Sequence, residues 1–114
     1  MSAEAPAVSV IIPARDAAEV LGACLEALIS GGQPAGKMEI LVAGSPGDAP
    51  TKAVVLAAAH RRADCPVRWV DNPAGSTPAG LNAALAAARG AVILRLDAHA
   101  LPAPDYVAAC LAAL

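Results

Sequence analysis

Short apolar runs alternate with stretches of helical periodicity along the whole chain, and this alternation most constrains the fold. Runs of Val, Ile and Leu this short indicate buried strands, while apolar residues three and four positions apart indicate amphipathic helices. Strands that alternate with helices over short connections predict a parallel sheet covered on both faces. We therefore expect an α/β fold, a Rossmann-like three-layer α/β/α domain with a mostly parallel sheet of about four strands. The predicted strands are residues 8–12, 38–43, 67–70 and 91–96.

Local start and stop signals place the helices between these strands and after the last one. Asp16, Thr51 and Thr77 are predicted N-caps, because short polar side chains accept hydrogen bonds from the free N–H groups of a first turn. Pro102 and Pro104 are expected to open the last helix. The third helix is predicted to bury a stripe formed by Leu81, Ala84, Leu85 and Ala88.

Composition limits the class of protein. The 114 residues form one predicted domain, residues 8–114, after a flexible leader at residues 1–7. The net charge is −2, with no basic block and no aromatic ladder, which argues against nucleic acid as a partner. No two of the three cysteines form a CxxC pair, so we expect all three to be free thiols. The sequence has no signal-peptide pattern and no run long enough to span a membrane, so we expect a cytoplasmic location.

Several nucleotide-binding and hydrolytic motifs are missing from the sequence. The turn after the first strand, Pro13 to Asp16, contains no glycine, whereas a dinucleotide-binding domain carries GxGxxG there. Neither Lys37 nor Lys52 lies in a P-loop, and no GxSxG nucleophile motif is present. The chain is therefore not expected to be a dinucleotide-binding domain, a P-loop protein or a hydrolase with a GxSxG nucleophile.

The fourth predicted strand ends in a sharp change of polarity at Asp97-Ala98-His99. In an extended chain, residues two apart point the same way, so Asp97 and His99 would share one face. Open α/β sheets bind ligands at the carboxyl ends of their strands, and these two side chains suit Mg²⁺ or Mn²⁺. The alternative is that Asp97 caps the next helix and His99 is structural.

Three segments carry a resemblance to a known family: residues 8–15, 72–85 and 89–99. With Ile-Ile-Pro-Ala-Arg closing the first strand and Arg-Leu-Asp-Ala-His the fourth, the chain resembles the amino-terminal half of a family 2 glycosyltransferase of the GT-A fold. The nearest subgroup extends bacterial exopolysaccharides, as succinoglycan-type enzymes do. The resemblance implies transfer of a sugar from a UDP- or GDP-type nucleotide-sugar to a saccharide or lipid-linked acceptor.

The resemblance also implies site residues. Pro13, Ala14 and Arg15 would line the nucleoside pocket. Asp97-Ala98-His99 would stand in the place of the family's DxD motif, with Asp97 contacting the donor and holding Mn²⁺ or Mg²⁺ and His99 as a second metal ligand. Asn82 is either a donor contact or a polar rim residue.

The second strand departs from the family pattern. Family members commonly end it with one or two aspartates that read the base, whereas this chain has Val42-Ala43-Gly44-Ser45 there. The nearest acid is Asp48. Either the Asp48 side chain contacts the donor in place of the missing aspartates, or recognition of the base is weakened.

The resemblance implies an inverting reaction whose acceptor half and catalytic base lie beyond the point where this chain stops. No catalytic residue is therefore expected within it, and the chain alone is expected to bind nucleotide weakly without turnover. The last helix stops at Leu114, still apolar, which predicts a missing C-terminal half or a homo-oligomer. Membrane association, at the inner face, is expected only through absent segments. The alternatives are a non-catalytic truncated nucleotide-binding or association module, and a nucleotidyltransferase, which the lack of a glycine-rich loop disfavours.

Overall fold

The computed structural model describes residues 6–31, 38–61 and 65–114, and it has the predicted order of elements. Within these ranges no helix combines the length and the apolar character that crossing a bilayer requires. Most of the predicted leader, residues 1–5, lies outside the described residues, while Pro6 is buried and the Ala7 carbonyl accepts a hydrogen bond from the Val92 N–H at 3.0 Å. The elements are β1 (Val8–Pro13), α1 (Ala18–Ser30), β2 (Met38–Gly44), α2 (Ala49–Arg61), β3 (Val67–Asp71), α3 (Thr77–Ala87), β4 (Val92–Arg95) and α4 (Tyr106–Ala112).

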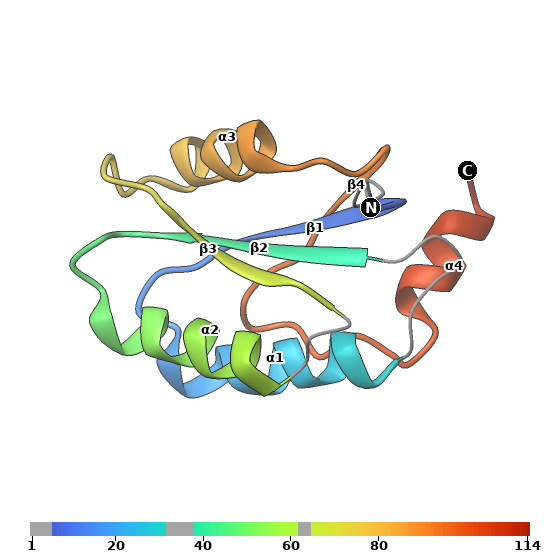
Figure 1. Ribbon diagram of the computed structural model, residues 1–114, viewed down its shortest axis with the longest axis horizontal. Coiled ribbons are helices and arrows are strands. Elements are labelled where there is room, and N and C mark those ends of the chain that lie inside the picture. Colours follow the sequence, from blue (N-terminus) through green and yellow to red (C-terminus); the bar gives the residue numbers. More distant parts are fainter. Residues whose placement is uncertain (1–5, 32–37, 62–64) are drawn as a thin grey trace, which may run out of the picture.

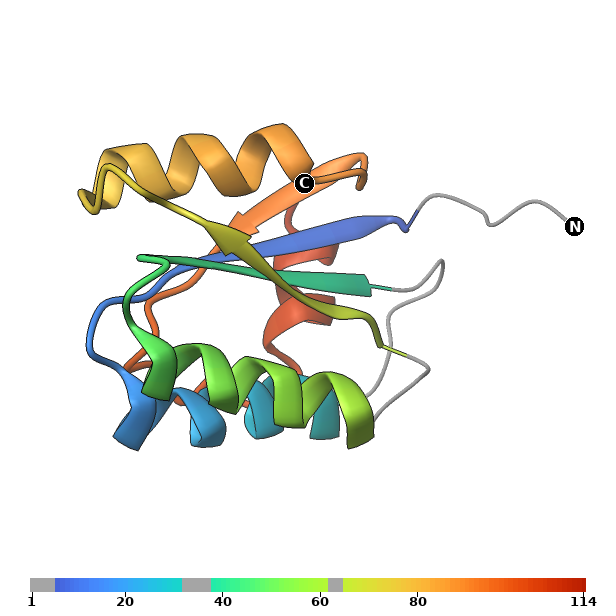
Figure 2. The same cartoon turned by 60° about the vertical axis from the view of Figure 1, so that its left-hand side comes forward.

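The four strands form one parallel sheet in the order β3-β2-β1-β4. Val10 of β1 is paired with Ile40 of β2 on one side and Leu94 of β4 on the other. Helices α1 and α2 cover one face of the sheet and α3 covers the opposite face (Figure 1). Figure 2 shows the same three layers after rotation. The predicted three-layer α/β/α class is confirmed.

Strand β4 lies at an edge of the sheet, and one of its faces is exposed although its apolar run predicts a buried strand. Val92 and Leu94 are partly buried and pack against the main core. Ile93 and Arg95 alternate with them and are exposed, Ile93 to 37%. A short apolar run indicates a strand but does not reveal how many neighbours the strand has, and β4 pairs only with β1 among the described strands.

The two faces of the sheet carry cores of different size. The face under α1 and α2 holds the larger cluster, which includes Leu21, Leu25, Ile40 and Val55. On the α3 face the hydrophobic cluster of buried residues is smaller and comprises Ile11, Leu41, Ala43 and Ala84. Helix α3 approaches the sheet through buried Gly80 and Ala84, which turns Leu85 outward to 51% exposure. The predicted burial of Leu85 is therefore wrong.

The helix ends differ from their sequence-based prediction. Asp16 lies outside α1 in a left-handed conformation with φ of 47°, and Ala17 occupies the N-cap position. Thr51 is buried within the first turn of α2, which begins at Ala49. Ser76, not Thr77, caps α3, and Pro102 and Pro104 precede α4 rather than opening it.

Candidate functional site at the carboxyl edge of the sheet

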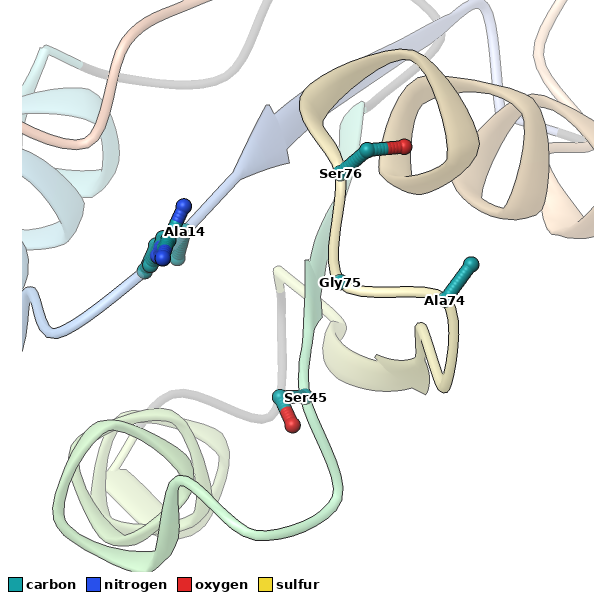
Figure 3. Close-up of a pocket in the computed structure, with 6 residues that line it drawn as sticks. Ala14, Ser45, Ala74, Gly75 and Ser76 are labelled. Carbon is teal, nitrogen blue, oxygen red and sulfur yellow. The ribbon is translucent and has the colours of Figure 1, made fainter.

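The loops that follow β1, β2 and β3 meet at the carboxyl edge of the sheet and enclose a cavity of about 430 Å³. Ala14 and Arg15 line it from the end of β1, Ser45 from the end of β2, and the segment Ala74 to Ser76 from the end of β3. Figure 3 shows Ala14 facing this last segment across the cavity, with Ser45 below them. Parallel strands bring all of their carboxyl ends to the same edge, which is where open α/β sheets bind ligands.

A second, smaller cavity of about 40 Å³ adjoins the first and shares several of its walls. It adds Pro13, so all three residues predicted to line the nucleoside pocket border this region. It also adds three residues to which the sequence gave no predicted role in binding: Ala43, Asn72 and Thr77. The site is thus built from consecutive strand ends.

Asn72 shapes the turn between β3 and α3. Its side chain is 6% exposed, its Nδ2 donates to the Ser76 carbonyl at 2.9 Å, and its Oδ1 accepts from the Gly75 N–H at 3.3 Å. Gly75 has φ of 79°, a conformation that favours glycine. A Cβ at Gly80 would lie 2.9 Å from the Asn72 amide nitrogen, so glycine there makes room for the amide. The spacing Asn-x-x-Gly is the sequence signal of this turn.

The electrostatics of the cavity favour an anion. The N-terminus of α3 opens on it through Ser76 and Thr77, and the Ser76 Oγ accepts from the Ala79 N–H at 3.3 Å. First-turn N–H groups and the helix dipole place partial positive charge there. Among the described residues that line the two cavities, Arg15 is the charged one, and it is exposed. This combination suits a phosphate group.

Asp48 does not line either cavity. Its carboxylate accepts hydrogen bonds from two backbone N–H groups instead. Its Oδ2 accepts from the Asp16 N–H at 2.9 Å and its Oδ1 from the Thr51 N–H at 3.4 Å. The Thr51 hydroxyl also donates to it, and this bond, ahead of the backbone bonds, lowers the pKa of Asp48 below its ordinary value. The structure therefore places Asp48 at the junction of two loops.

Asp97 follows β4 in a turn whose backbone is held on both sides. The Leu96 N–H continues the ladder to the Ile11 carbonyl at 3.1 Å, and both Leu96 and Ala98 are buried. The Asp97 carbonyl accepts from the Ala100 N–H at 3.0 Å and from the Cys24 thiol at 3.6 Å. Burial, and then the charge of Asp97, raises the pKa of the Cys24 thiol to about 11.

The turn at residues 97–100 contradicts the prediction that the Asp97 and His99 side chains share one face. Asp97 and His99 are both exposed, but the chain from Asp97 to Ala100 is turned rather than extended, so spacing by two does not place their side chains on one face. Neither residue lines the two cavities described above, and Asn82 is exposed on α3 outside them. Their roles in donor and metal binding stay predictions.

The described residues contain no group of three or more His, Cys, Asp or Glu side chains that could hold a metal ion. The Asp97 carboxylate is exposed and has no hydrogen-bond or ion-pair partner within 6–31, 38–61 and 65–114. Mg²⁺ commonly uses one or two carboxylates together with substrate phosphates and waters. Asp97 fits that type of site, in which the substrate supplies the remaining ligands.

Comparisons with known proteins bear on the family and on the fold. A family model described as "Glycosyl transferase family 2" matches residues 9–114. No curated protein matches the sequence significantly. The crystal structure of S. aureus TarS 1-349 is similar, with a TM-score of 0.76, 20% identity, and coverage of 92% of this chain and 31% of that one. Glucosyl-3-phosphoglycerate synthase from Mycobacterium tuberculosis in complex with uridine diphosphate gives a TM-score of 0.64 and 19% identity, covering 90% of this chain and 38% of that one. The chain thus spans about a third of the length of these structures.

Proposed function

Because this chain belongs to glycosyl transferase family 2, we propose that its carboxyl-edge cavity binds the nucleoside diphosphate part of a sugar nucleotide. In this proposal the chain supplies the donor side of a glycosyltransferase that passes the sugar to a saccharide or lipid-linked acceptor in polysaccharide synthesis. The observation that carries the proposal is the position of the cavity, which lies where Pro13, Ala14 and Arg15 meet the start of α3.

The size and walls of the cavity support this ligand class. About 430 Å³ falls within the range of small-molecule sites. Ala14 and Ala74 offer apolar surface to a base, while Arg15 and the N-terminus of α3 offer positive charge to phosphate. The uridine diphosphate named for the mycobacterial structure makes UDP the first nucleotide to test.

We propose Asp97 as the carboxylate that, with the donor diphosphate, would hold Mn²⁺ or Mg²⁺. The family resemblance alone makes His99 the second ligand in this proposal. When bound, such an ion supplies Lewis-acid stabilisation of the leaving diphosphate. The chain's own contribution is to hold the Asp97 backbone through the Cys24 thiol and the Ala100 N–H. An inverting transfer also needs a carboxylate that takes the proton of the acceptor hydroxyl, and we assign no residue of this chain to that role.

The proposal is tested by titrating UDP, GDP and CDP against the chain with and without Mn²⁺, using thermal stability and calorimetry. We expect one nucleotide to stabilise the chain in a metal-dependent way, because a ligand that binds only the folded state raises the melting temperature. Asp97→Asn should remove the metal dependence and weaken binding about tenfold or more. Asp105→Asn, an exposed carboxylate just before α4, is the matched control and should bind as the wild type does.

Two outcomes would contradict the proposal. If no nucleoside diphosphate changes the melting temperature at millimolar concentration, the cavity is not a donor site. Concentration-dependent self-association in the same samples would then favour a non-catalytic association module. If Asp97→Asn and Asp105→Asn respond alike, the assignment of the metal carboxylate is wrong.

A further inference from the structure

The turn between β1 and α1 is hydrogen-bonded to the end of β2, to the loop that follows it and to the first turn of α2. The Ala14 N–H donates to the Ala43 carbonyl at 2.8 Å, the Asp16 N–H to Asp48 Oδ2 at 2.9 Å, and the Ala17 N–H to Thr51 Oγ1 at 3.1 Å. These donors flank Arg15 on both sides. The direction in which the chain leaves β1 is therefore set by side chains more than thirty positions away in the sequence.

The turn needs this support because of its backbone conformation. Asp16 has φ of 47°, which is unfavourable for a residue with a Cβ, although aspartate tolerates it better than most residues. Asp16 is exposed, so packing does not hold it there. Conformations of this kind persist where the surroundings determine them, and here the hydrogen bonds to Asp48 and Thr51 do so.

Asp48 and Thr51 form a single unit. The Asp48 carboxylate accepts from the Thr51 N–H at 3.4 Å and from the Thr51 hydroxyl, while the oxygen of that hydroxyl accepts from the Ala17 N–H. The Thr51 side chain is fully buried in the first turn of α2, which fixes its rotamer. The hydroxyl therefore acts as donor and acceptor at once, as a buried threonine must to satisfy its polar atoms.

We propose that Asp48 and Thr51 are positioning residues of the donor cavity, which fix the turn at residues 14–17 so that Ala14 and Arg15 face the segment Ala74–Ser76. They line neither cavity and act only through the backbone that carries Ala14 and Arg15. This inference rests on the proposed function. It gives Asp48 a role different from the direct donor contact predicted from the sequence.

The experiment compares nucleotide affinity in variants that differ in one hydroxyl. Thr51→Val keeps the branched shape but removes the two hydrogen bonds of the hydroxyl, to the Ala17 N–H and to the Asp48 carboxylate, while the Thr51 N–H can still donate to Asp48. Thr51→Ser restores the hydroxyl. With the nucleotide and metal that stabilise the wild type, we expect Kd to rise about tenfold in Thr51→Val and to stay within about twofold in Thr51→Ser. The ¹H–¹⁵N resonance of Arg15 should move in Thr51→Val and return in Thr51→Ser.

A control variant separates positioning from loss of stability. Ser9→Ala removes a buried hydrogen bond to Glu39 at the opposite edge of the sheet, so it should lower the melting temperature while leaving Kd unchanged. If Thr51→Val does not fold, Asp48→Ala replaces it, because Asp48 lies at a partly exposed position and its loss opens the same turn.

The results of these binding experiments distinguish failure of the positioning role from failure of the proposed donor-binding function. If the wild type binds nucleotide and both Thr51→Val and Asp48→Ala bind it equally well, the positioning role is wrong and the proposed function stands. If Ser9→Ala weakens binding as much as Thr51→Val, the effect is one of general stability and the inference is overturned. If the wild type binds no nucleoside diphosphate, the proposed function fails, and the inference fails with it.

Discussion

At the scale of the single residue, the most informative side chain outside the cavity is Glu39, a fully buried carboxylate on β2. Its Oε2 accepts from the Ser9 hydroxyl at 2.6 Å and the Arg89 N–H at 2.7 Å, and its Oε1 accepts from Arg68 at 3.0 Å. Burial by itself would raise the pKa of Glu39, but these hydrogen bonds outweigh it and the pKa is lowered. Glu39 thereby ties the connection between α3 and β4 to the amino edge of the sheet.

We predict that Glu39→Gln lowers the free energy of unfolding by about 2 kcal/mol at pH 7, because an amide cannot accept all of these donors. The lowered pKa of Glu39 means that the ionised form stabilises the folded state. That contribution is present above the unfolded-state pKa of about 4.3 and is lost as the pH falls through the lower folded-state pKa. Urea unfolding of the wild type and of Glu39→Gln between pH 7 and pH 2.5 measures this contribution to the free energy of unfolding.

The exposed Glu19 on α1 provides the control for this prediction, since Glu19→Gln should change the free energy of unfolding by less than about 0.5 kcal/mol. A gap between wild type and Glu39→Gln that stays constant down to pH 2.5 would contradict the role given to the ionised carboxylate.

At the scale of the element, the start of α3 decides the shape of the cavity. The turn from Asn72 to Ser76 is closed by its own side chains, and the Ser76 Oγ caps the helix. Thr77 is also a residue type found at N-caps, but Ser76 has the extended conformation typical of a cap, with φ of −82° and ψ of 155°. The cap is therefore one residue earlier than the Thr77 predicted from the sequence, at the end of the loop that precedes the helix.

We predict that Ser76→Ala lowers the free energy of unfolding by about 1 kcal/mol, the usual effect of losing an N-cap. Thr77→Ala, which removes a hydroxyl one position later, should change it by less than about 0.5 kcal/mol. Chemical denaturation of the two variants measures both effects. A larger loss in Thr77→Ala than in Ser76→Ala would show that the cap had been assigned to the wrong residue.

At the scale of the whole molecule, the sheet is packed unequally on its two faces. The cluster under α1 and α2 contains large side chains such as Leu21, Leu25 and Ile29, all almost completely buried. On the α3 face the helix contributes fully buried surface mainly through Ala84, while Leu85 remains half exposed. Because burial of apolar area is the main stabilising term, α3 should be the least stable of the three long helices.

We predict that amides in the middle of α3 exchange with solvent at least about tenfold faster than those in the middle of α1, since local opening of α3 exposes little apolar surface. Native-state hydrogen exchange followed by NMR tests this directly. Binding of the nucleotide should slow exchange selectively in the first turn of α3, which borders the cavity. Equal protection of α1 and α3 in the free protein would contradict the uneven core.

The sequence by itself determined the order of elements and the class of the fold, because strand and helix periodicities are local properties of the chain. Its resemblance to a known family, and not its periodicity, indicated three residues that border the cavity: Pro13, Ala14 and Arg15. Only the tertiary structure decided the uses of Asp48 and Thr51, whose partners lie on another loop, and the exposure of β4 and Leu85. Those features depend on which elements become neighbours, and neighbours in space are not encoded in any local pattern.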